Sequence, residues 1–290
     1  VQWVRLAAEQ ECQLVAFGET LIPGNPFWLE PTGGATFNDS FQKQMFAHYI
    51  DQAVCVAEGH LDPLCRVASE RGITVMVGCY ERATDRGGHS GYCSLVTISS
   101  EGQIFNVHRK AMPTHEERLV WGIGDGHGLR TFARGPFTVG GLNCWENWMP
   151  LMRAALYGMG EDLHVAVWPG GIHNTRDITR FAAMEGRSYV GSVSGLMRNS
   201  DIPSDIPHAE TLKERCPELM ATGGSCIAAP NGDWVVEPIG PVEELITATL
   251  QHEMVRQERH NFDAAGHYAR PDVTQLHVNR TRQSTVRVND

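Results

Sequence analysis

The stretch Phe137-Thr-Val-Gly-Gly-Leu-Asn-Cys144-Trp-Glu-Asn-Trp148 runs from apolar residues to a thiol and then into a polar cluster. The residues over 137–143 predict a β-strand, and Pro150 predicts the start of a helix soon after it. A free cysteine is most often a small core residue. Cys144, however, stands at the end of the apolar run rather than inside it, which favours a reactive thiol.

Helical and strand patterns alternate on both sides of this stretch. Helices are expected over 3–11, 41–57, 67–71, 150–159 and 175–187, and strands over 13–17, 73–80, 91–99, 103–108, 163–168, 189–194, 225–229 and 234–238. This alternation predicts an α/β fold in which helices cover a mixed sheet. Since no linker or repeat divides the chain, we expect one domain over 1–270 and a polar tail over 271–290.

Composition narrows the classes of function. A chain of 290 residues with 42% apolar and 20% charged residues is typical of a globular α/β domain. The net charge of -10, with 24 Lys and Arg and no dense basic run, disfavours a nucleic-acid partner. No apolar stretch reaches the length of a membrane span, so we expect no membrane partner.

The eight cysteines are scattered, without a Cys-x-x-Cys pair or a matching Cys/His spacing. This pattern argues against a zinc site or a disulfide framework and favours a reducing compartment, most simply the cytoplasm. The glycine-rich segment 122–128 lacks the preceding strand and the following Lys-Ser/Thr of a phosphate loop, so we expect a mobile or tight loop there. We therefore expect neither a metal nor a cofactor.

Three charged residues besides Cys144 are candidates for chemistry, because each falls near the end of an expected strand or in the loop beyond it. Taken singly, each has an ordinary explanation: Glu19 as a helix cap or rim ion pair, Lys110 as an exposed lysine, and Glu117 as a helix-start acid. As a set they supply a thiol nucleophile with a carboxylate base and an ammonium that stabilises developing charge.

Tryptophans lie near Cys144 in sequence or at the end of the next strand. Such residues are more often core than pocket, but Trp145 and Trp168 are our candidates for lining an apolar substrate cleft.

Several ordered motifs resemble those of the nitrilase branch of the carbon-nitrogen hydrolase superfamily. They are Leu14-Val-Ala-Phe-Gly-Glu19-Thr, His108-Arg-Lys110-Ala-Met-Pro-Thr-His-Glu-Glu117, Gly141-Leu-Asn-Cys144-Trp-Glu-Asn, the segment 174–180 and the segment 261–271. The resemblance implies a four-layer αββα sandwich that forms dimers or larger spirals. It also implies an active site made of Glu19, Lys110, Glu117 and Cys144.

The same resemblance implies hydrolysis of a small-molecule nitrile to a carboxylic acid and ammonia through a cysteine thioimidate. An amidase or N-carbamoyl amide hydrolase with the same four residues is an alternative, and a non-catalytic assembly protein is another. Gly18 replaces the usual proline before the glutamate, and Asn25 replaces a common aromatic residue, so substrate preference does not carry over. Only Val1-Gln2 could remain of the first strand of the family, and a truncated N-terminus would remove a central strand.

Overall fold

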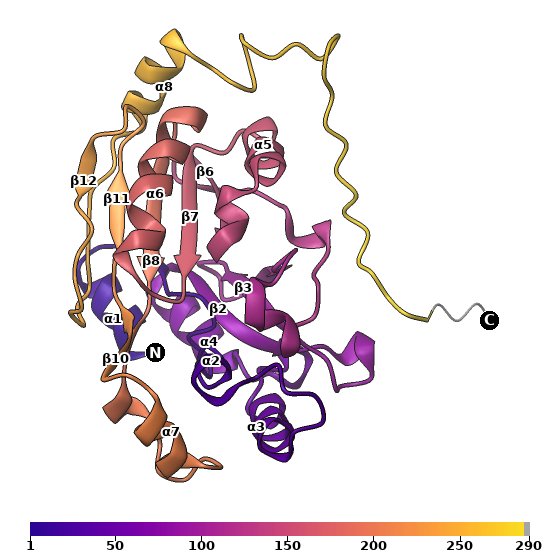
Figure 1. The fold of residues 1–290 in the computed structure, drawn as a ribbon. Coiled ribbons are helices and arrows are strands. Elements are labelled where there is room, and N and C mark those ends of the chain that lie inside the picture. Colours follow the sequence, from indigo (N-terminus) through magenta and orange to yellow (C-terminus); the bar gives the residue numbers. More distant parts are fainter. Residues whose placement is uncertain (287–290) are drawn as a thin grey trace.

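The computed structural model describes residues 1–286, which form two packed β-sheets between layers of helices (Figure 1). The first sheet contains, in spatial order, β1 (Leu14–Ala16), β2 (Thr74–Arg82), β3 (Gly91–Ile98) and β4 (Ile104–Arg109). The second contains β12 (Trp234–Val236), β11 (Cys226–Ala228), β8 (Tyr189–Ser194), β7 (Leu163–Trp168), β6 (Phe137–Asn143) and β5 (Phe132–Arg134). Both sheets mix parallel and antiparallel pairs, as the alternating pattern predicted.

The central strands of the first sheet are buried on both faces. Side chains alternate across a strand, so Val75, Val77 and Cys79 of β2 face outward toward α1 (Gln2–Glu9) and α4 (Asp62–Arg71). Met76 of β2 and Leu95 of β3 face the other way and pack against Val139, Val165 and Val167 of the second sheet.

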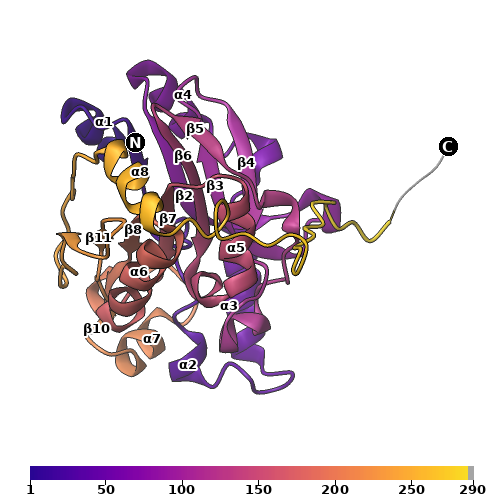
Figure 2. The same cartoon turned by 90° about the horizontal axis from the view of Figure 1, so that it is seen from above.

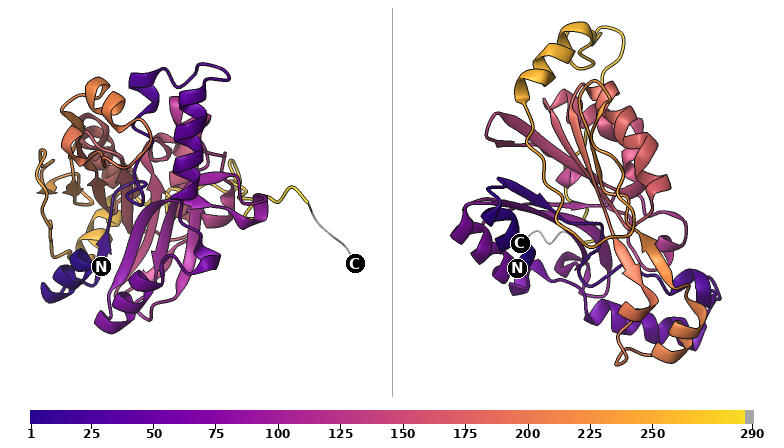
Figure 3. Two further views of the ribbon diagram at one scale, coloured as in Figure 1. Left: turned by 90° about the horizontal axis from the view of Figure 1, so that it is seen from below. Right: turned by 90° about the vertical axis from the view of Figure 1, so that its left-hand side faces the viewer.

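Helices α5 (Pro150–Gly158) and α6 (Ile172–Gly186) cover the outer face of the second sheet, where Leu156 packs on Leu142 and Ala183 packs on Val190. The molecule is therefore the expected αββα sandwich, seen edge-on in the right-hand view of Figure 3. Helix α8 (His252–Asn261) packs through Val255 at one end of this sheet (Figure 2).

The helix expected over 41–57 is wrong over its last part, residues 52–57. Helix α3 (Ser40–Asp51) ends at Asp51, and Val54 then pairs with the edge of β2 at Glu81. The backbone N–H of Val54 donates to Tyr80 O, and Arg82 N–H donates to Val54 O. Pairing with a strand distant in sequence thus overrides the local helical pattern.

Several short elements were not predicted because they span too few residues to show a period. They are α2 (Leu29–Thr32), β5, β9 (Leu196–Arg198), α7 (Ala209–Arg215) and β10 (Leu219–Thr222), together with the 3-10 turns other than His115–Leu119. Helix α8 was also missed. Gln2 already belongs to α1, so Val1-Gln2 forms no strand.

Residues 262–286 contain no helix or strand. Near residue 282 the segment contacts the rest of the domain. Arg282 forms an ion pair with Asp125 at 3.1 Å, and the Gln283 backbone N–H donates to the same carboxylate. The division into a domain over 1–270 and a tail over 271–290 stays a prediction, and residues 287–290 lie outside the described part. Within residues 1–286, no helix combines the length and the apolar character that crossing a membrane requires.

Candidate active site

Cys144 occupies a sharp turn between β6 and the 3-10 helix Cys144–Trp148. Its φ is +48°, a left-handed conformation that costs energy in a residue with a Cβ and that is common at functional turns. The side-chain amide of Asn147 donates to the Cys144 carbonyl at 2.8 Å and supports this turn. The thiol is only 2% exposed and packs beside Trp168.

Lys110 follows β4 and is completely buried, so its interpretation as an exposed lysine is wrong. Its ammonium lies 2.9 Å from Glu19 Oε1 and 2.7 Å from Glu117 Oε2. It also lies 5.2 Å from the centre of the Trp121 ring. A buried ammonium requires such partners, because burial without them is costly.

Glu19 reaches the site because its loop crosses β2 at very close range. An added Cβ at Gly78 would lie 2.3 Å from Gly18 O, so only glycine permits this crossing. The Glu19 backbone N–H donates to Trp168 O at 3.2 Å, which ties the loop to the end of β7. Cys93 Sγ on β3 donates to Glu19 Oε1 at 3.3 Å.

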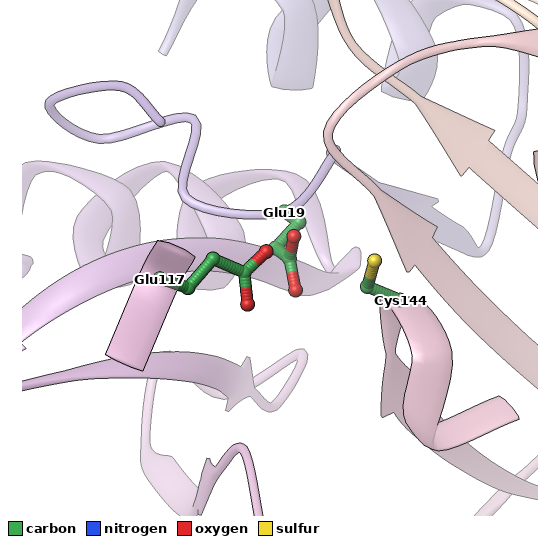
Figure 4. A group of neighbouring side chains, drawn as sticks. All are labelled: Glu19, Glu117 and Cys144. Carbon is green, nitrogen blue, oxygen red and sulfur yellow. The ribbon is translucent and has the colours of Figure 1, made fainter. Parts of the chain in front are cut away.

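Glu117 lies on the 3-10 helix His115–Leu119, as its helix-start pattern predicted. Its carboxylate accepts a hydrogen bond from the Thr114 backbone at 2.6 Å as well as the Lys110 ion pair. Glu117 is therefore both a helix-start acid and an ion-pair partner of Lys110. Figure 4 shows the carboxylates of Glu19 and Glu117 lying beside the thiol of Cys144.

Burial and the neighbouring charges set the resting protonation states of Glu19, Cys144 and Lys110. Burial raises the pKa of Glu19 to about 7, against the lowering effect of Lys110, and the negative charge of Glu117 adds to the rise. Burial and the charge of Glu19 raise the pKa of the Cys144 thiol, so the resting thiol is protonated. Burial would lower the pKa of Lys110, but Glu19 and the other acidic groups raise it overall, so its ammonium stays charged.

Glu19, Glu117 and Cys144 each offer one ligand atom, and these atoms lie within 4.8 Å of one another. Such a trio could hold a metal ion on distance alone. The ammonium of Lys110, however, already contacts both carboxylates and occupies the place of a cation. The donor set therefore fits the lysine better than a metal.

Sequence reasoning missed Glu146, although it stands in the quoted stretch two residues after Cys144. This fully buried carboxylate accepts from the backbone of Ala111 at 2.6 Å and of Asn143 at 2.9 Å, and it contacts His108 Nε2 at 3.0 Å. Burial raises the pKa of Glu146, but His108 and the two backbone groups lower it overall, so it is ionised. The side chain of Glu146 thus connects Ala111, the residue after Lys110, to Asn143, the residue before Cys144.

The two candidate substrate-binding tryptophans differ in exposure. The ring of Trp145 is 49% exposed and lies 6.3 Å from the ring of Trp148. The ring of Trp168 is completely buried beside Cys144, and its Nε1 donates to Ser192 at 3.1 Å. Trp168 is thus a core residue in the structure, and a substrate-binding role for either tryptophan stays a prediction.

The glycine-rich segment 122–128 forms a tight loop against β4 and its end. Gly124 N–H donates to Lys110 O at 2.9 Å, and an added Cβ at Gly124 would lie 2.3 Å from Arg109 O. This loop therefore supports the backbone of Lys110.

Curated relatives match nearly the whole chain. A nitrilase ("Nitrilase 2") of an unknown prokaryotic organism is 35% identical over 99% of this chain and 88% of its own length. An aliphatic nitrilase of Sinorhizobium fredii is 33% identical over 99% of this chain and 91% of its own length. A bifunctional nitrilase/nitrile hydratase of Nicotiana tabacum is 32% identical over 94% of this chain and 78% of its own length.

Solved structures share the fold at much lower identity. A carbon-nitrogen hydrolase from Helicobacter pylori superposes with a TM-score of 0.68 at 16% identity, covering 93% of this chain and 88% of its own. An amidase from Nesterenkonia superposes with a TM-score of 0.63 at 16% identity, covering 90% and 88%. The carbon-nitrogen hydrolase family matches residues 1–260. With three buried side chains and the partly buried Glu117 gathered at one site, and with relatives of this similarity, the chain belongs to the carbon-nitrogen hydrolase family.

Proposed function

We propose that this protein is a nitrilase, which hydrolyses a small organic nitrile to a carboxylic acid and ammonia. The observation that carries the proposal is the Lys110 ammonium between two carboxylates, both within 4.8 Å of a thiol held in a strained turn. The curated relatives named above are nitrilases, and each is at least 30% identical to this chain.

In the first half of the reaction, Glu19 takes the proton of Cys144 while the sulfur attacks the nitrile carbon. An S–C bond forms and one C≡N π bond breaks, and the nitrogen then takes the proton from Glu19, which gives a neutral thioimidate and returns Glu19 to its carboxylate form. Lys110 and the backbone N–H of Trp145 stabilise the charge that develops on nitrogen. Burial raises the pKa of the Cys144 thiol overall, but the backbone N–H of Trp145 lowers it, which supports a role for this N–H in stabilising negative charge at the site.

In the second half, water adds to the thioimidate and ammonia leaves, which gives a thioester. Glu19 then activates a second water that hydrolyses the thioester, frees the acid and returns the proton to the thiol. Glu117 holds Lys110 in place through both halves, and it is itself held by the Thr114 backbone.

The same residues could attack an amide carbonyl, so an amidase is the second candidate. In one structure of the Nesterenkonia amidase, acrylamide has added to the active-site cysteine. At 16% identity, this likeness supports the shared fold alone and not the amide preference.

Ammonia release from matched nitriles and amides tests the proposal. Each pair should share its carbon skeleton, in arylacetic, aromatic and aliphatic versions, with Cys144→Ala as the blank. We expect release from at least one nitrile at a rate well above that from its amide. Release from amides alone would assign the protein to the amidases, and release from neither would favour a non-catalytic assembly role.

We also propose that the protein forms a homo-oligomer, at least a dimer. Large apolar side chains remain exposed on the 3-10 turn after Cys144 and at the start of α5, namely Trp145, Trp148, Met149 and Leu151. Several exposed large apolar side chains on one short segment favour an association surface. Light scattering should show that Leu151→Glu lowers the mass of the particle, whereas Phe37→Glu, on the exposed loop between α2 and α3, should not.

We also propose a compartment on the basis of the thiols. All eight cysteines are free, which supports the cytoplasm as the proposed location.

A further inference from the structure

Cys93 is a buried thiol that the proposed mechanism does not use. It lies on β3, is 1% exposed, and donates its S–H to Glu19 Oε1 at 3.3 Å. Burial and the charge of Glu19 raise the pKa of the Cys93 thiol, so it keeps the proton that it donates. A thiol is a weak donor, but a buried carboxylate acceptor strengthens the bond.

The two oxygens of Glu19 have different surroundings. Oε1 contacts both Lys110 Nζ, at 2.9 Å, and Cys93 Sγ. Oε2 is buried and has no hydrogen-bond partner among residues 1–286. An unsatisfied buried acceptor is energetically unfavourable, so one that is retained calls for a functional explanation, such as accepting a proton during the reaction. A carboxylate oxygen of Glu19 lies within 4.8 Å of the Cys144 sulfur, which has a proton to give.

Lys110 alone would not fix the rotation of the Glu19 carboxylate. An ammonium acts as a point charge with rotatable donors, and the terminal torsion of glutamate is broad. A second donor on the same oxygen, coming from a different strand, restricts that rotation.

We propose that Cys93 is a positioning residue, whose thiol holds Glu19 Oε1 beside Lys110 and thereby leaves Oε2 free to take the proton of Cys144. This inference rests on the proposed role of Glu19 as the base. It adds a fifth side chain, contributed by β3, to the four that the family motifs predict.

The alternative is that Cys93 only fills space. It packs in an apolar cluster with Trp28, Tyr49 and Trp121, and removing its sulfur would leave a small cavity. The two explanations differ in what they predict for the base. The groups that act on Glu19 are Lys110 after β4, Glu117 on the 3-10 helix, Cys144 after β6, Tyr49 on α3 and Cys93 itself. Of these, Cys93→Ala removes only the thiol donor.

The test measures alkylation of Cys144 by iodoacetamide against pH, with the modified peptide identified by mass spectrometry. In this reaction an S–C bond forms, iodide leaves, and Glu19 takes the thiol proton, so the rate rises as Glu19 becomes ionised. No nitrile is needed, and ammonia release from nitriles by the same samples tests the proposed function separately.

We expect Cys93→Ala to lower the alkylation rate about 5- to 10-fold near pH 7, the effect of losing one modest hydrogen bond to the base. Losing a donor to the ionised carboxylate raises its pKa, so the rise in rate should move to higher pH. Cys93→Ser keeps a hydrogen-bond donor, so its alkylation rate should stay within about threefold of the wild-type rate. The increase of this rate with pH should occur at the same or a lower pH than in the wild type.

Cys79→Ala is the matched control, because Cys79 is a fully buried thiol on the neighbouring strand β2 that packs toward α1 and α4. It should lose stability without changing the pH profile of alkylation. A Cys93→Ala profile equal to that of the Cys79→Ala control would overturn the proposal. If Cys93→Ala does not fold, Cys93→Ser serves as the test. A folded Cys93→Ser protein whose Cys144 is alkylated ten times more slowly than in the wild type would also overturn the proposal.

Discussion

Glu146→Gln is the substitution that most sharply tests how the site is assembled. The carboxylate of Glu146 accepts from two backbone N–H groups, Ala111 at 2.6 Å and Asn143 at 2.9 Å, and each bond is made by a different oxygen. Glutamine keeps the shape of the side chain, but it replaces one of these oxygens by an NH2 group that cannot accept. One backbone N–H therefore loses its partner inside the core.

A hydrogen bond to a charged group contributes about 1.5–3 kcal/mol, and an unsatisfied buried donor costs a further 1 kcal/mol or so. We therefore expect Glu146→Gln to lower the free energy of unfolding by roughly 3 kcal/mol, which corresponds to a fall in Tm of about 6–12 °C for a chain of this size. Because the lost bond also fixes Lys110 relative to Cys144, kcat should fall by about two orders of magnitude.

Asp162→Asn provides a matched control. Asp162 is also buried and also accepts from a backbone N–H, that of Thr138 at 2.6 Å, and from a histidine, His252 at 2.8 Å. Thr138 lies near the start of β6, whereas Cys144 follows its end. Melting curves and ammonia release should show that Asp162→Asn loses stability but keeps its kcat. If both variants lose similar stability and both keep kcat, the coupling through Glu146 is refuted.

Four further outcomes follow from the geometry. Glu19→Gln should fold and lose about three orders of magnitude in kcat, since the thiol loses its base; near-full turnover would remove Glu19 from that role. Glu117→Gln should give a folded and nearly inactive protein, and normal ammonia release would reduce Glu117 to a helix-start acid. The pKa of Glu19 is raised to about 7, so kcat/KM should be low in acid and rise through about pH 7, and a profile flat from pH 5 to 8 would contradict this assignment. Gly78→Ala should lower Tm by several degrees, because the added Cβ would lie 2.3 Å from Gly18 O; an unchanged melting curve would show that the loop can move away.

Much of the sandwich could be predicted because its strands carry strong local signals. The β-branched run of β2 and the hairpin of β3 and β4 appear in the sequence at nearly their observed bounds. The same holds for β6, β7 and β8, which form the parallel centre of the second sheet. The helix expected over 41–57 ends early, at Asp51, because Val54 pairs with β2, a contact that no local pattern records.

In the sequence, no single residue of the site is recognisable as catalytic from its local surroundings, and only the four residues taken together indicate the chemistry. The local sequence around Lys110 suggests an exposed lysine, and its burial depends on carboxylates 91 residues before it and 7 after it, at positions 19 and 117. Glu146 forms a local capping box with Asn143, but Ala111 and His108, the partners that connect it to Lys110, are brought to it only by the fold. Cys93 likewise stands among apolar strand residues, and only the approach of the Glu19 loop gives its thiol a partner.

Covalent capture of the substrate tests the central claim most directly. The protein would be mixed with a nitrile that it hydrolyses, quenched in acid at intervals, and digested for mass spectrometry. The account predicts an acyl or imidoyl adduct on the peptide that contains Cys144, appearing before product and decaying at the rate of turnover. It predicts neither adduct nor ammonia from Cys144→Ala. Ammonia release by Cys144→Ala at the wild-type rate, or an adduct on another cysteine that forms and decays with turnover, would contradict it.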